Sequence, residues 1–159
     1  MKKILLIAIL AMPLSVFSQV EKGDINAQGN VTYTSIDGTG TGIIFLKGGY
    51  YATQQIETGA SLQFIFAAGE TGTGIGPYVT YNFLTPDAKL LPYAGAQLSF
   101  LSFLGTSINS GGIYGGTKYF ITESVNIDGG LSIQQGFGDF SGTLVTFTLG
   151  VGFVLGKLK

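Results

Sequence analysis

The segment 125–137 alternates between large apolar residues and small or polar ones. One face holds Val125, Ile127, Leu131, Ile133 and Phe137, and the other holds Asn126, Asp128, Ser132 and Gln134. A period of two is typical of a β-strand whose two faces meet different environments. Segments with a similar alternation are found at 24–34, 42–52, 56–67, 75–84, 91–103, 111–121 and 143–155. The pattern therefore predicts an all-β protein.

The number and length of these segments narrow the fold further. The chain has 159 residues, enough for one domain, and short connections rich in Gly, Thr, Ser and Asp separate the segments. An even number of antiparallel strands, each long enough to cross an apolar layer at a tilt, is typical of the smallest membrane barrels. We therefore expect a single eight-stranded antiparallel up-and-down transmembrane β-barrel.

The charge of the polar face indicates which face lies outside. A soluble lipocalin-like carrier is the alternative, with its polar face in water, and such a surface carries many Lys and Glu residues. Here the strand interiors place four charged residues on the polar face, namely Lys47, Glu57, Lys118 and Asp128. The other face is nearly free of charge, as contact with lipid demands. We expect the polar face to line a packed lumen.

The N-terminus has the features of a secretory signal peptide over residues 1–18. Lys2 and Lys3 precede an apolar stretch, residues 4–12, that is too short to span a bilayer. Val16 and Ser18 suit the −3 and −1 positions of a cleavage site, and an uncleaved anchor is the alternative. This predicts a barrel domain over residues 19–159 and a location in the cell outer membrane.

Several chemistries are excluded by residues that the chain lacks. It contains no His, Cys or Arg, so we expect neither a Ser-His-Asp triad nor a thiolate metal site, and the Gly-rich stretches lack the Lys-Ser/Thr of a phosphate loop. Residues 19–159 carry six Lys against nine acidic residues, a net charge of −3, without a basic patch for nucleic acid. We expect no enzymatic activity, no cofactor, no metal and no nucleic-acid partner.

The four charged residues are the candidate site, as a polar network in the lumen. If Thr122, Glu123 and Ser124 form a three-residue turn, Lys118 faces Asp128 across two neighbouring strands, close enough for an ion pair. The same register in the earlier hairpin makes Lys47 and Glu57 diagonal rather than paired. A charged constriction for a solute is one interpretation. A structural network is the favoured one, because eight strands leave space for side chains and little else.

Outward aromatic residues are expected to form two girdles at the borders of the apolar layer. Tyr50, Tyr81, Phe83 and Tyr119 lie next to the turns that follow even-numbered strands, on the expected periplasmic side. Tyr33, Phe66 and Phe137 lie near the opposite rim.

Three short motifs resemble a known group of proteins. Residues 50–56 (YYATQQI) align with residues 119–125 (YFITESV), which indicates two turns of the same kind. Residues 77–83 read PYVTYNF before LPY, and Ser18-Gln19 forms the junction at the end of the short signal. The chain thus resembles small outer-membrane β-barrel proteins of Bacteroidetes-type bacteria, related in architecture to OmpX, OmpA and OmpW. The resemblance implies outer-membrane lipid and the barrel assembly machinery as partners, and we expect a monomer.

The functional expectation is a structural or envelope-maintenance role for a barrel with a filled polar lumen. One alternative is a narrow channel, or OmpW-like transport of small or apolar solutes. Another is surface interaction or a place in a secretion assembly, which the short predicted loops make less favoured.

Overall fold

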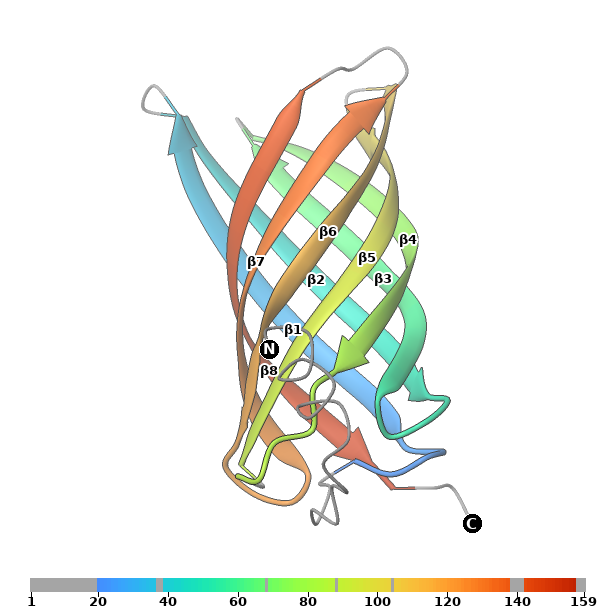
Figure 1. Cartoon of the computed structure of the whole chain (residues 1–159). Coiled ribbons are helices and arrows are strands. Elements are labelled where there is room, and N and C mark those ends of the chain that lie inside the picture. The colour runs from blue at the N-terminus through green and yellow to red at the C-terminus, as the bar shows by residue number, and fades with distance from the viewer. Residues whose placement is uncertain are drawn as a thin grey trace, which may run out of the picture.

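The computed structural model describes residues 20–36, 39–67, 69–87, 89–103, 105–137 and 142–156, and its strands form a closed barrel in sequence order (Figure 1). Every neighbouring pair is antiparallel, and β8 closes the barrel against β1. The strands are β1 Ile25–Ile36, β2 Thr39–Tyr51, β3 Ile56–Ala67, β4 Glu70–Asn82, β5 Leu90–Phe103, β6 Thr106–Phe120, β7 Val125–Phe137 and β8 Thr143–Leu155. The predicted eight-stranded antiparallel barrel is confirmed. The predicted signal peptide, residues 1–18, lies outside the described residues.

The two faces of each strand are also as predicted. On β7, Asn126 and Asp128 point inward and are fully buried, whereas Leu131 points outward with 58% of its surface exposed. The soluble alternative, with the polar face outside, is therefore wrong. The described residues contain no helix of the length and apolar character needed to span a membrane.

Several strands are longer than the alternation indicated. β3, β7 and β8 have the predicted bounds, but β4 and β6 begin at Glu70 and Thr106, in segments that Gly, Ser and Thr had marked as loops. Backbone pairing does not need large side chains, and glycine admits close backbone approach. At Gly74, in the added part of β4, a Cβ atom would lie 3.1 Å from the carbonyl oxygen of Phe100 on β5.

The turns at one end of the barrel follow the predicted equivalence. In the turn between β2 and β3, the Thr53 Oγ1 atom accepts hydrogen bonds from the backbone N–H groups of Gln55 and Ile56, at 3.2 and 2.9 Å. Thr122 Oγ1 does the same for Ser124 and Val125 between β6 and β7, at 3.3 and 3.0 Å. These turns, the β4–β5 connection and both ends of the described chain lie at the lower end of the barrel in Figure 1.

All seven aromatic residues predicted for the girdles point outward, with exposed fractions between 43% and 74%. They are Tyr33, Tyr50, Phe66, Tyr81, Phe83, Tyr119 and Phe137. The rings of Tyr81 and Phe83 meet edge to face, with centroids 5.1 Å apart. Their orientation is confirmed, and their role at a membrane border stays a prediction.

Candidate functional site

An ion pair crosses the lumen between two strands that are not neighbours. Lys118 Nζ on β6 lies 2.8 Å from Glu57 Oε2 on β3, and both side chains are almost fully buried. Glu57 Oε1 accepts hydrogen bonds from Asn26 Nδ2 at 2.8 Å and from the Tyr78 hydroxyl at 2.7 Å. Lys118 Nζ also donates to the Tyr51 hydroxyl at 3.1 Å. A buried charge pair is stable in a protein when hydrogen bonds complete it in this way.

The predicted pairing of Lys118 with Asp128 is wrong, although the register behind it is right. The two residues face each other on β6 and β7, but the flexible four-carbon stem of Lys118 carries its ammonium group across the narrow lumen to Glu57. Asp128 Oδ1 instead accepts hydrogen bonds from Asn30 Nδ2 and the Tyr93 hydroxyl, each at 3.1 Å. The strand register determines the position of the Lys118 backbone, but the narrow lumen lets the end of its long side chain reach a strand on the other side.

Lys47 occupies the lumen in a different way. Lys47 faces Ser61 and Tyr51 faces Glu57 in the β2–β3 register, so Lys47 and Glu57 are diagonal, as predicted. The Lys47 ammonium lies 4.3 Å from the ring centroid of Tyr114 and 5.4 Å from that of Tyr78. Within the described parts of the chain Lys47 forms no ion pair, and attraction to the aromatic faces stabilises its charge.

Three inward tyrosines, Tyr78, Tyr93 and Tyr114, form a buried cluster that the sequence analysis did not include in the site. The ring centroids of Tyr93 and Tyr114 are 6.0 Å apart, and the Tyr114 hydroxyl shares a 2.5 Å hydrogen bond with Thr80. A sequence signal does exist. Each of these two rings lies beside an inward glycine on the neighbouring strand, where a Cβ would meet the tyrosine: Tyr93 faces Gly116, and Tyr114 faces Gly95.

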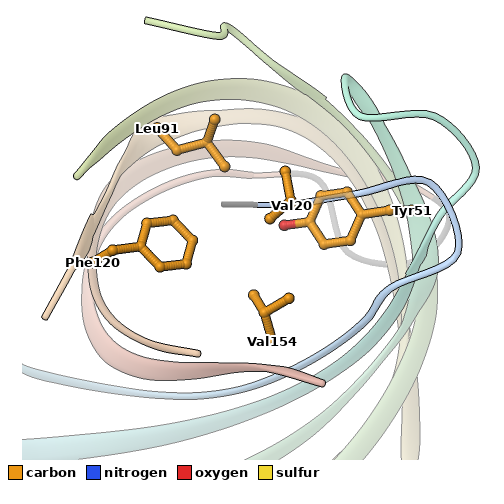
Figure 2. Packing of buried hydrophobic residues seen from close by; sticks show 5 residues of the cluster. All are labelled: Val20, Tyr51, Leu91, Phe120 and Val154. Atoms are coloured by element: carbon orange, nitrogen blue, oxygen red, sulfur yellow. The ribbon is translucent and has the colours of Figure 1, made fainter. Parts of the chain in front are cut away.

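The lower mouth of the barrel is filled by an apolar cluster, which we call the mouth cluster. Figure 2 shows its five side chains pointing toward one another from separate parts of the chain: Val20, Tyr51, Leu91, Phe120 and Val154. Val20 precedes β1 and is fully buried. Val20 lies inside the predicted barrel domain, but its place in the mouth was not predicted, because nothing in the nearby sequence indicates that this residue folds back into the barrel.

A hydrogen-bonded turn holds the N-terminal residues against the end of β2. The Gly23 N–H group donates to the Tyr51 carbonyl, and the Tyr51 N–H group donates to the Asp24 carbonyl, both at 2.9 Å. Asp24 Oδ2 accepts a 2.7 Å bond from the Glu21 N–H group. Gly23 has a φ of 99°, a conformation that L side chains rarely adopt, so glycine suits this turn.

Above the ion pair the lumen contains a cavity of about 20 Å³, lined in part by Asn30, Lys47, Tyr93 and Ser132. Asn30 Oδ1 and Asp128 Oδ2 are buried near it without a hydrogen-bond partner among the described residues. A polar cavity of this size accommodates about one water molecule. Within those residues, no three His, Cys, Asp or Glu side chains are grouped so as to hold a metal ion. The described contacts pack the lumen and pair the charges of Lys118 and Glu57.

Comparison with known proteins identifies the architecture. No protein-family model matches the chain, and no curated protein matches it. Among solved structures it is similar to the N-terminal β-barrel domain of Pseudomonas aeruginosa OprF, with a TM-score of 0.67 and 24% identity over 85% of this chain and 98% of that domain. Neisserial surface protein A is similar at a TM-score of 0.60 and 18% identity, over 85% of this chain and 97% of that one.

The outer membrane protein OprG from Pseudomonas aeruginosa is a third similar structure, with a TM-score of 0.56 and 15% identity over 87% of this chain and 99% of that one. At these identities the likeness shows a shared fold and no more. The eight-stranded antiparallel barrel is therefore the shared fold, whereas the resemblance to proteins of Bacteroidetes-type bacteria stays a prediction.

Proposed function

We propose that this chain is an integral outer-membrane protein with a closed, filled lumen and a structural or envelope-maintenance role. The membrane location is supported by the outer surface, where large apolar side chains such as Leu131 and Phe147 are exposed around the barrel. An apolar surface of this extent favours lipid over water. Similar barrels carry names that place them at the cell surface or in the outer membrane, which also supports this location.

In this proposal the lower end of the barrel faces the periplasm. The short turns after β2, β4 and β6 lie there together with both described chain ends, the usual arrangement of such barrels. The outward aromatic residues would mark the two borders of the bilayer. Outer-membrane lipid and the barrel assembly machinery are the proposed partners, and a cleaved signal peptide is the proposed route of export.

The main support for a closed lumen is the ion pair between Lys118 and Glu57. It joins opposite walls of the barrel at 2.8 Å, and it is surrounded by the hydrogen bonds from Asn26, Tyr51 and Tyr78. The mouth cluster closes the lower end as a second barrier. A solute crossing the lumen would have to displace both, and separating the charges would leave each of them buried and unpaired. No catalysis is part of this role.

The closed lumen is tested by electrical recording of the purified protein in planar lipid bilayers. Folding is checked first by the faster migration of the unboiled protein on a detergent gel. We expect no steady conductance from the wild-type protein. A variant carrying Val20→Gly, Glu57→Ala and Lys118→Ala, which removes parts of both barriers, is expected to leak. Steady wild-type conductance would contradict the closed lumen, and recovery of the protein from the soluble periplasm would contradict the membrane location.

The alternatives from the sequence are less well supported. Proteins that bind partners at the cell surface usually have long loops at the upper end of the barrel. Here these connections are short: β3 ends at Ala67 and β4 starts at Glu70, and β5 ends at Phe103 and β6 starts at Thr106. A transport role would need a route other than the lumen. The feature that bears on such a route is the upper half of the contact between β1 and β8.

A further inference from the structure

The ladder that closes the barrel stops halfway up. Residues Ile25 to Val31 of β1 pair with Leu155 to Leu149 of β8, but β1 continues to Ile36 and β8 begins at Thr143. Within the described residues, no ladder pair joins 32–36 to 143–148. The other edges of these segments are paired, with Ile36 opposite Thr39 and Thr143 opposite Gln135. In Figure 1 the β1–β2 hairpin leans away from β7 and β8 toward the upper end. We call these two facing edges the upper seam.

A side-chain hydrogen bond lies where the ladder ends. Continuing the register would place Thr32 opposite Thr148, but Thr32 Oγ1 instead donates a 2.9 Å hydrogen bond to the Phe147 carbonyl. Beyond this contact, the strand ladders of the described residues leave the backbone groups along these two edges without a partner strand. In the outer-membrane location proposed above, unpaired backbone groups are costly because lipid offers them no hydrogen bonds.

The side chains beside the upper seam have an apolar outward face. The outward residues are Tyr33 on β1 and Val145 and Phe147 on β8, and all three are exposed. The inward residues Thr32 and Thr146 are uncharged. An occupant of the seam must therefore have one apolar face, one uncharged face, and backbone donors and acceptors along both edges.

We propose that the occupant is a second copy of this chain, with β1 of each copy pairing with β8 of the other along their upper halves. The lower halves of the same two strands already pair antiparallel, which shows that the two edges fit each other. A two-fold axis along the membrane normal brings β1 against β8 twice, so that one contact satisfies all four open edges. An apolar solute could fill the space but would leave the backbone groups unpaired. This inference departs from the monomer expected from the sequence.

Cysteine crosslinking tests the proposal directly, because the chain has no Cys of its own. Two differently tagged copies, one with Tyr33→Cys and the other with Phe147→Cys, are produced together in the outer membrane of a Gram-negative host and oxidised. Positions 33 and 147 continue the observed register. We expect a disulfide-linked heterodimer of twice the chain mass. Matched copies with Ala27→Cys and Phe153→Cys, which face each other within one barrel, should give no heterodimer.

A single chain with both Tyr33→Cys and Phe147→Cys distinguishes the remaining outcomes. An intramolecular disulfide alone would overturn the proposal, because the seam then closes on itself. Two free thiols, alongside an intramolecular disulfide in the Ala27→Cys and Phe153→Cys double variant, would overturn it in favour of an open lateral route.

The wild-type protein provides a measurement that does not depend on the folding of a variant. Native mass spectrometry of the protein extracted from membranes should give the mass of two chains. The mass of one chain from a heat-modifiable membrane protein would overturn the dimer and leave the proposed function standing. Recovery from the soluble periplasm would overturn both.

Discussion

Lys118 and Glu57 form an ion pair of 2.8 Å although their strands, β6 and β3, do not neighbour each other in the barrel. The contact links residues that are 61 positions apart in the sequence. It therefore ties two hairpins together through the lumen, in addition to the backbone ladders that join neighbouring strands around the wall.

Replacing Glu57 with Gln should destabilise the barrel by about 3–5 kcal/mol, because it leaves the Lys118 ammonium buried without its anion. The chain has no Trp, so the folded fraction at increasing urea is measured from the mobility of unboiled protein on a detergent gel. The control is the double variant Glu57→Gln/Lys118→Met, which removes both charges and should recover most of the loss. A single variant as stable as the wild type would show that the ion pair contributes nothing.

Replacing Asp128 with Asn should have a smaller effect than Glu57→Gln in the same titration. Asp128 accepts hydrogen bonds from Asn30 and Tyr93 and does not hold Lys118. An amide oxygen still accepts both bonds, so we expect a loss of about 1–2 kcal/mol, the difference between a charged and a neutral acceptor. A loss as large as that of Glu57→Gln would indicate that Lys118 is neutralised mainly by Asp128.

Replacing Leu131 with Arg tests the outward face. If this residue faces the middle of the bilayer, the charge should cost about 2–4 kcal/mol of stability in lipid vesicles. Thr143→Arg, at the upper end of β8 and also exposed, is the control and should be close to neutral. Equal effects at the two positions would argue against an apolar layer centred on Leu131.

Replacing Val20 with Ser should weaken the mouth cluster by about 1.5–3 kcal/mol, the value of burying a side chain of this size. Hydrogen exchange measures the local effect: the amide of Tyr51, bonded to the Asp24 carbonyl, should exchange faster. Lys22→Ser, at an exposed position of the same turn, should leave both stability and exchange unchanged. Unaltered protection of Tyr51 in the Val20 variant would mean that the turn forms without the cluster.

Replacing Gly95 with Ala tests the fit between the Tyr114 ring on β6 and the neighbouring strand β5. A Cβ at Gly95 would overlap the Tyr114 ring and the Val79 carbonyl, and overpacking of this kind costs about 1–3 kcal/mol. Gly48→Ala is the matched control, because a Cβ there meets no atom within 4 Å. Equal stability of the two variants would show that the Tyr114 ring moves aside freely.

The sequence correctly predicted those structural features that depend on a single strand or a single turn. Each residue of 125–137 faces either the lumen or the outside, so the alternation alone gave its orientation correctly. The turn of Thr122, Glu123 and Ser124 gave the correct register of Lys118 against Asp128. The ion pair with Glu57 could not be predicted in this way, because it depends on the closure of the whole barrel and on the distance that a lysine side chain crosses.

Three other structural features could not be predicted from the sequence, each for a different reason. The upper ends of β4 and β6 consist mostly of Gly, Ser and Thr, which are equally common in loops, so only the neighbouring strand shows that they are paired. The place of Val20 depends on residues from four strands that are distant in the sequence. The end of the β1–β8 ladder follows from the path of both strands, and no residue near Val31 or Leu149 signals it.

The mouth cluster also has a consequence for the order of events during folding. It joins Val20 at the start of the described chain to Val154 in the last strand, so it cannot be completed before β8 has been placed. Contacts between residues so far apart in sequence are slow to form. Substitutions at Val20 should therefore accelerate unfolding while leaving the folding rate nearly unchanged, as expected for interactions absent from the transition state. The first residues of the described chain would therefore be among the last to reach their final positions.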